Sequence, residues 1–173
     1  MIGEQEFRDL MAGVCAPVTV VTGALDGVPY GATVSAFAAL SLRPPMVMVA
    51  LDARSSLLTR IVATGRFGVN VLGHAQAGVA TAFARRGADR FAGADWDYDH
   101  GLPRLARSPG WLVCEVARAV EGGDHLLLLG TVIHAGTGTA APLVYAHRTF
   151  GTHSALARHP RHSIADHVRA CAR

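Results

Sequence analysis

The chain has 173 residues, a formal net charge of +3 at pH 7, and hydrophobic side chains at half of its positions. This length suits one domain with a buried core, and no apolar run approaches the ~20 residues that a membrane-spanning helix needs. Every basic residue is Arg, and the Arg residues are scattered, so no basic stripe indicates nucleic-acid binding. We expect neither a membrane nor a nucleic acid among its partners.

The first residues, MIGEQEFRDL, carry acids where a secretory signal has basic residues, and no long apolar stretch follows them. We therefore expect a cytoplasmic protein. Cys15, Cys114 and Cys171 lie far apart and form no C-x-x-C pair, which argues against a disulfide framework or a zinc site. Each is expected to be a small buried hydrophobe.

The chain is expected to begin with a helix, because Phe7, Leu10, Met11 and Val14 share one face at a period of 3.6 residues. Strands dominate afterwards, and they are expected at residues 17–23, 28–37, 46–52, 66–73, 111–123, 125–136 and 142–150. Short helices are expected at 55–64 and 75–86, with a polar loop over 87–105. Since β-α-β alternation is missing, the pattern favours an antiparallel barrel.

The sequence contains no G-x-G-x-x-G, Walker, G-x-S-x-G or H-E-x-x-H motif. A first feature that could bind a ligand is the run Gly31–Ala36, where small residues and two hydroxyls interrupt an apolar strand. A flat ring could lie against this backbone and accept hydrogen bonds from it. The alternative, which the run by itself favours, is an edge strand with polar residues facing water, because half-polar strands are common.

A second feature is the run Asp52–Ser56 at the expected start of a helix. Unpaired backbone N–H groups, two hydroxyls and the Arg54 guanidinium together make a good phosphate site. Serine is also the ordinary N-cap residue, so helix capping alone could account for Ser55 or Ser56.

A third feature is Gly122-Gly123-Asp124-His125, between two apolar strands. A His at this position can exchange a proton near neutral pH, and the glycines allow a cofactor to approach closely. A plain hairpin turn is the alternative. His153, His159, His162 and His167 gather near the C-terminus, but no acid or Cys completes a ligand set, so we expect no bound metal.

These features, in this order, resemble the flavin reductase family, whose fold is an FMN-binding split barrel and whose members supply reduced flavin to two-component monooxygenases. The matching stretches are FRDLMAGVCAPVTVVTG, GVPYGATVSAFAALSLRPPMVMVALDARSS, FGVNVL, FARRGADRF, the GDH of residues 123–125, and PLVYAHRTF. Each stretch alone is a weak signal, but all of them in order cover residues 4–152. Family members often have Thr where this chain has Ser56, which keeps the hydroxyl.

The resemblance implies a role for each part of the site. The isoalloxazine ring and ribityl chain would be held by Thr33, Val34, Ser35 and Ala36. Ser41 and Leu42 would border the nicotinamide side. The phosphate would be wrapped by Ala50, Leu51, Asp52, Ala53, Arg54, Ser55 and Ser56. Ala84, Arg85 and Arg90 would reach the phosphate or an adenine-side group. His125 would be the catalytic residue, beside the nicotinamide and the flavin N5.

We therefore expect residues 1–152 to form a mainly β, antiparallel Greek-key split β-barrel of six or seven strands with short flanking helices, followed by a partly helical tail over residues 153–173. The implied activity is hydride transfer from NADH or NADPH to FMN or FAD, with the reduced flavin passing to a partner monooxygenase. The family generally forms homodimers. Two alternatives stay open: a pyridoxamine-phosphate-oxidase-like flavoenzyme, and a non-catalytic flavin- or haem-binding split-barrel protein.

Overall fold

The computed structural model describes residues 2–85, 87 and 89–157. Of the predicted tail over residues 153–173, this part includes the short helix α4 (Ser154–Ala157), whereas residues 158–173, with three of the clustered histidines, lie outside it. Among the helices of the described part, none has the length and apolar character needed to cross a membrane.

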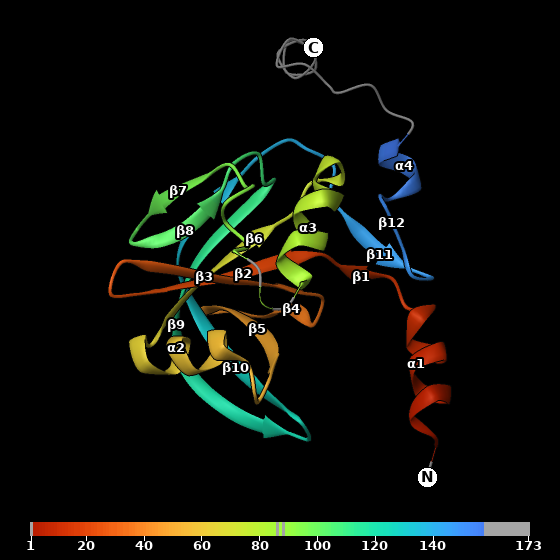
Figure 1. Ribbon diagram of the computed structural model, residues 1–173, viewed down its shortest axis with the longest axis horizontal. Helices are drawn as coiled ribbons and strands as arrows, with labels where there is room; N and C mark the ends of the chain where they lie inside the picture. The colour runs from red at the N-terminus through yellow and green to blue at the C-terminus, as the bar shows by residue number, and fades with distance from the viewer. Residues whose placement is uncertain (1, 86, 88, 158–173) are drawn as a thin grey trace.

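A seven-stranded antiparallel sheet forms the body of the molecule (Figure 1). The strands follow the order β3-β2-β6-β9-β10-β5-β4. Their bounds are β2 (Thr19–Leu25), β3 (Val28–Val34), β4 (Phe37–Leu42), β5 (Pro45–Asp52), β6 (Arg66–Val71), β9 (Gly110–Gly122) and β10 (His125–Thr137). This arrangement confirms the predicted mainly β, antiparallel split-barrel architecture.

The remaining elements surround this sheet. The helices are α1 (Glu4–Ala12), α2 (Ser56–Thr64), the 3-10 turn η1 (His74–Gln76) and α3 (Ala77–Ala84). The remaining strands are β1 (Ala16–Pro17), β7 (Trp96–Asp99), β8 (Leu102–Leu105), β11 (Val144–Ala146) and β12 (Thr149–Gly151). Strands β1, β11 and β12 form a small sheet of their own.

The barrel is split between its outermost strands, β3 and β4, which no backbone ladder joins in the described part of the chain. The single strand predicted over residues 28–37 is broken at Ser35 and Ala36, where the chain crosses from one edge to the other. The Ala50 N–H of β5 donates to the Ala36 carbonyl at 3.0 Å and secures the crossing. The outer edge of β3 therefore presents backbone groups that no neighbouring strand takes up.

Helix α2 is anchored by its apolar face. Leu57, Leu58 and Ile61 are buried in the barrel core together with Phe67 of β6. Gly65 ends the helix in the left-handed conformation, with a φ of 69°. Because three core side chains hold α2, its N-terminus has a fixed position at the end of β5.

The segment over 87–105 was predicted to be a polar loop, and this was wrong: it contains the hairpin β7–β8. Buried polar side chains of the barrel hold this hairpin in place. The Asn70 side-chain oxygen accepts from the Leu105 N–H at 2.7 Å, and the Thr22 hydroxyl donates to the Pro103 carbonyl at 2.8 Å. The hairpin thus satisfies groups that would otherwise be buried without a partner.

The last predicted strand, residues 142–150, is instead a hairpin of β11 and β12. The expectation that every cysteine is buried holds for Cys114 but is wrong for Cys15, which is exposed, and Cys171 lies outside the described residues. Burial raises the pKa of the Cys114 thiol to about 12, so that it stays protonated and unreactive at neutral pH.

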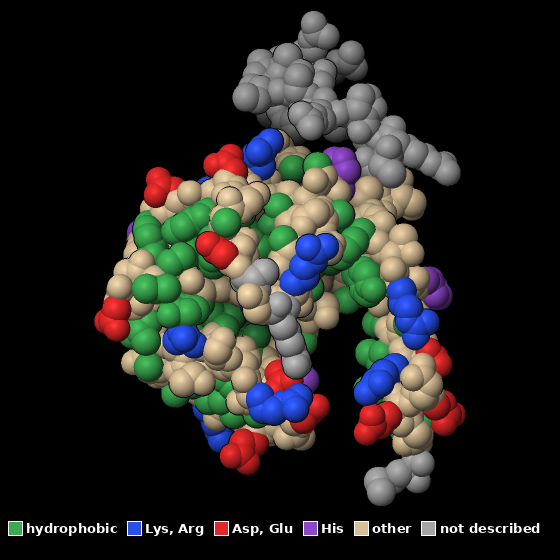
Figure 2. All heavy atoms as spheres, viewed as in Figure 1, with side chains coloured by type: hydrophobic (Ala, Val, Ile, Leu, Met, Phe, Trp, Pro, Cys, Tyr) green, Lys and Arg blue, Asp and Glu red, His purple; other side chains and the backbone are tan. Residues whose placement is uncertain are grey.

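Helix α1 has the predicted amphipathic pattern, but none of its residues is buried. Figure 2 shows the helix separated from the body by an open gap, with hydrophobic side chains on the side that faces the gap. Phe7, Leu10 and Met11 are among the exposed large hydrophobic residues. The helix is attached near its C-terminal end, where the His147 N–H donates to the Ala12 carbonyl and Arg148 pairs with Asp9.

Candidate functional site

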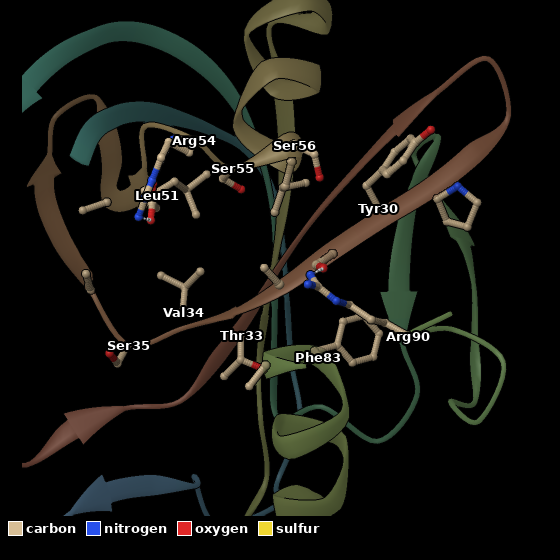
Figure 3. A pocket seen from close by; sticks show the side chains of 18 of the residues that line it. Tyr30, Thr33, Val34, Ser35, Leu51, Arg54, Ser55, Ser56, Phe83 and Arg90 are labelled. Carbon is tan, nitrogen blue, oxygen red and sulfur yellow. Dashed lines mark hydrogen bonds and ion pairs between the residues drawn. The ribbon is translucent and has the colours of Figure 1, made fainter. Parts of the chain in front are cut away.

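The split in the barrel holds an open pocket of about 870 Å³, a size within the usual range for small-molecule sites. Strand β3 forms one wall, the end of β5 and the start of α2 form a second, and the end of α3 with the segment after it forms a third (Figure 3). His125, at the start of β10, completes the lining.

Most residues that the resemblance implied meet at this pocket. They are Thr33, Val34, Ser35, Ala36, Ala50, Leu51, Asp52, Arg54, Ser55, Ser56, Ala84, Arg90 and His125. Ser41, Leu42, Ala53 and Arg85 do not line it. Ser41 and Leu42 lie at the far end of β4, and Leu42 is 79% exposed there, so one copy of the chain does not bring them to the pocket.

The N-terminus of α2 opens into the pocket through Ser55 and Ser56. Ser55 occupies the N-cap position with extended backbone, yet its side chain makes no capping hydrogen bond. The N–H groups of the first turn of a helix have no intrahelical partners. Capping alone therefore does not account for Ser55, and its hydroxyl, with the helix N-terminus, is available to an anion.

Arg54 and Asp52 form an ion pair beside this helix start. The Arg54 Nε and Nη2 atoms donate to the two Asp52 carboxylate oxygens at 3.2 and 3.1 Å, and the Arg54 N–H donates to Oδ1 at 2.8 Å. The hydrogen bond from the Arg54 side chain lowers the pKa of Asp52 to about 2. Both groups are therefore charged at neutral pH, and the guanidinium, mostly exposed, can share its charge with a second anion.

His125 lies on the same side of the pocket as this ion pair. It pairs in register with Asp52 of the neighbouring strand β5, and it follows a two-residue turn in which Gly123 has a φ of +66°. The Asp124 carbonyl accepts from the Ala53 N–H at 3.0 Å, which ties the turn to the loop before α2. The Asp124 carboxylate lies 2.7 Å from His125 Nδ1, and this hydrogen bond lowers the pKa of Asp124.

Strand β3 contributes backbone and small side chains to the pocket. The Thr33 hydroxyl donates to the Ala80 carbonyl of α3 at 2.6 Å, so it fixes the strand to the helix. Gly31 was expected to permit the close approach of a backbone or ligand. Gly31 lines the pocket, and it also has an aromatic ring as a close neighbour, because a Cβ on Gly31 would lie 2.8 Å from Phe83 Cε1.

Sequence reasoning missed several lining residues, among them Pro29, Tyr30, Phe83, Asp89 and Phe91. The Arg60 guanidinium of α2 stacks on the ring of one of them, Tyr30, 3.7 Å from its centroid. Phe83 and Phe91 were visible in the sequence as the two aromatic residues of FARRGADRF, but nothing in that spacing indicates that both rings pack under β3.

Comparison with known proteins agrees with this geometry. Residues 11–154 match the family described as flavin reductase like domain. The chain is 40% identical over 150 residues to the reductase component of 4-nitrophenol 4-monooxygenase/4-nitrocatechol 2-monooxygenase from Rhodococcus opacus, covering 87% of this chain and 81% of that one. It is 42% identical over 158 residues to NADH:riboflavin 5'-phosphate oxidoreductase from Streptomyces pristinaespiralis, covering 87% of this chain and 89% of that one.

Solved structures show the same fold. The NADH:FAD oxidoreductase SgcE6 of Streptomyces globisporus, in complex with NAD and FAD fragments, aligns with a TM-score of 0.84 at 29% identity, covering 89% of this chain and 96% of that one. The two sequence relatives, at 40% and 42% identity, agree with this structural likeness, and so does the family match over residues 11–154. The chain belongs to the flavin reductase like domain family.

Proposed function

We propose that this chain is an NAD(P)H:flavin oxidoreductase that reduces FMN or FAD and supplies the reduced flavin to a partner monooxygenase. The observation that carries the proposal is one pocket that combines a helix N-terminus suited to a phosphate, an open strand edge suited to a flat polar ring, and a histidine between two strands. The named activities of the relatives from Rhodococcus and Streptomyces support the same reaction class.

The phosphate end of the flavin is assigned to Ser55, Ser56 and Arg54. The two serines offer hydroxyls and the α2 backbone offers N–H groups, while Arg54 adds a positive charge held in place by Asp52. Each of these groups favours an anion over a neutral ligand. The dipole of α2 acts in the same direction.

The ring end of the flavin is assigned to the β3 edge. From Gly31 to Ala36 the strand offers backbone groups with little side-chain bulk, and buried Val34 and Leu51 add apolar surface. A planar ring with hydrogen-bonding edges suits such a surface. When bound, the flavin and the nicotinamide supply the redox chemistry by hydride transfer, and the chain supplies orientation and electrostatics.

His125 is proposed to contact the nicotinamide or the flavin. With Nδ1 beside the Asp124 carboxylate, Nε2 is the ring nitrogen left to meet a ligand. In the imidazolium form both ring nitrogens donate, and an Nε2–H at this place would stabilise negative charge as it develops during hydride transfer.

A homodimer is part of the proposal, with the exposed face of α1 as part of the interface. Phe7, Leu10, Met11 and Val14 form an apolar stripe that no element within the described part of the protomer covers. A second copy of the chain is the partner that is always present, and closed two-fold dimers are the most frequent assemblies. A cytoplasmic location is proposed as well, since reduced nicotinamide cofactors are available there.

Steady-state kinetics test the reaction. Purified protein is expected to oxidise NADH or NADPH only when free flavin is added as a second substrate, because reduced flavin leaves the pocket. A pyridoxamine-phosphate-oxidase-like enzyme would require its own organic substrate, and a non-catalytic binding protein would give no turnover under any condition. Comparing both nicotinamides with FMN, FAD and riboflavin also determines the preferred pair.

His125→Ala is expected to lower kcat/KM for the nicotinamide on the order of 10²-fold, because one positioned donor is lost from the reacting centre. Flavin affinity, measured by fluorescence titration, should change little. His74→Ala, which removes an exposed imidazole outside the pocket, is the matched control. Wild-type kcat/KM in the His125 variant would reduce this residue to a turn position, and loss of flavin binding would place it in the flavin pocket instead.

A further inference from the structure

Arg90 directs its guanidinium at backbone carbonyls from two distant parts of the chain. Its Nε donates to the Arg85 carbonyl at 2.9 Å, and its Nη1 donates to the Gly31 carbonyl at 2.5 Å. Arg85 directly follows α3, whereas Gly31 lies in the middle of β3. Figure 3 shows the Arg90 side chain lying across β3 beside Phe83. One side chain therefore ties the third wall of the pocket to the first.

The Gly31 carbonyl belongs to the open edge of β3. In an antiparallel pair, alternate residues direct their backbone groups toward the partner strand and the others direct them away. Because the Gly31 carbonyl points to Arg90, Gly31 and Thr33 direct their backbone groups away from β2 and toward the pocket. Arg90 thus hydrogen-bonds the Gly31 carbonyl of this edge, and the backbone groups of Thr33 are available to a ligand.

Two aromatic rings also pack tightly against β3 at Gly31. Phe83 and Phe91 meet edge to face with ring centroids 4.9 Å apart, and both would contact a Cβ on Gly31 at 3.2 Å or less. The Asp89 carboxylate accepts from the Phe91 N–H at 3.0 Å and shapes the chain just before the ring. The two rings pack on the face of β3 at Gly31 and Arg90 hydrogen-bonds its edge, so both hold Asp89, Arg90 and Phe91 against the strand.

We propose that Arg90 is a positioning residue that holds Asp89, Arg90 and Phe91 against β3 and the end of α3, so that the wall beside the flavin ring is formed before the flavin binds, and that it does not bind the flavin phosphate. This inference rests on the proposed function of the pocket, and it replaces the role at the phosphate or an adenine-side group that the resemblance implied for Arg90. A wall that is already ordered favours binding because less conformational entropy is lost when the ligand enters.

Riboflavin and FMN separate the two roles, because they share the ring and ribityl chain but only FMN carries a phosphate. Arg90→Ala and Arg90→Lys are both expected to weaken riboflavin and FMN by the same factor, on the order of tenfold, in fluorescence titrations. Lys keeps the positive charge but cannot span two carbonyls as the planar guanidinium does. The full-length variants without flavin should also show faster amide hydrogen exchange in β3 and in the segment around Phe91.

Two reference variants calibrate the result. Ser55→Ala combined with Ser56→Ala should weaken FMN but not riboflavin. Arg107→Ala, which removes an exposed guanidinium paired with Asp95 at the surface, should bind both flavins like the wild type.

The inference is overturned if Arg90→Ala weakens FMN more than riboflavin while Arg90→Lys keeps FMN affinity, since that pattern identifies a phosphate contact. It is also overturned if exchange and both affinities stay at wild-type values. A lower melting temperature with unchanged flavin affinity in the folded variants would limit Arg90 to a role in stability, which contradicts the proposal. Failure of the wild-type protein to bind riboflavin, FMN or FAD would instead refute the proposed function.

Discussion

Helices α1 and α2 have nine residues each and are both amphipathic, yet the protomer uses them in opposite ways. Helix α2 buries Leu57, Leu58 and Ile61 in the barrel core, whereas no residue of α1 is buried. An apolar stripe shows that a helix has a partner, but it does not show whether that partner lies in the same chain. For α2 the partner is the barrel, and for α1 we propose a second copy of the protein.

The difference has a functional consequence. Because the core holds α2, its N-terminus stays at one end of the pocket, where the proposed phosphate would bind with little reorganisation. Within the described residues, Arg148 and the backbone of His147 attach helix α1 near its C-terminal end. An element attached in this way suits association between subunits better than precise positioning of a ligand.

The largest expected effect concerns the buried face of α2. Ile61→Ala should lower the free energy of unfolding by about 2–5 kcal/mol, because it leaves a cavity around a fully buried side chain. Val62→Ala, at the next position and 57% exposed, is the matched control and should change it by no more than ~0.5 kcal/mol. Urea denaturation measures both values. Equal effects of the two substitutions would remove the contrast between the faces of α2.

A second effect, of intermediate size, concerns the exposed face of α1. Leu10→Asp should weaken dimer formation by about 2–4 kcal/mol. In a two-fold dimer both subunits carry the substitution, so two unpaired carboxylates would be buried in one interface. Light scattering at micromolar concentration should then report a monomer with normal circular dichroism. Val62→Asp places the same charge on an exposed position of α2 and should leave the dimer intact. A wild-type protein that is already monomeric and fully active would show that α1 needs no second copy.

The smallest effect concerns the N-terminus of α2. Ser55→Ala combined with Ser56→Ala should raise the FMN dissociation constant at least tenfold, about 1.4 kcal/mol or more, because hydrogen bonds to a charged acceptor are lost. Since the Ser55 side chain does not cap the helix, the unfolding free energy should change far less than in Ile61→Ala. Unchanged FMN affinity with a normal circular dichroism spectrum would contradict the phosphate assignment.

Local patterns in the sequence were sufficient for much of the fold. The periodicity of Leu57, Leu58 and Ile61 placed α2, and Gly65 marked its end within one residue of the observed helix. The Gly-Gly-Asp run marked the turn between β9 and β10. Such features depend on neighbouring residues, so they can be recognised without knowing the rest of the structure.

Other features depend on contacts between distant segments, and only the tertiary structure decided them. The hairpin β7–β8 follows from buried polar groups of Asn70 and Thr22 that lie more than thirty residues earlier. Position 31 has room only for glycine because the rings of Phe83 and Phe91, which follow β6 in the sequence, pack on it. Arg90 donates a hydrogen bond to the Gly31 carbonyl of β3 across 59 positions of sequence. The sequence alone therefore determined several elements, such as α2 and the turn between β9 and β10, and the residue types that could bind a phosphate. The split, the pocket between β3 and β5, and the partner of each polar side chain were decided by tertiary packing, because a hydrogen bond or a steric contact between distant segments leaves no periodic trace in either segment.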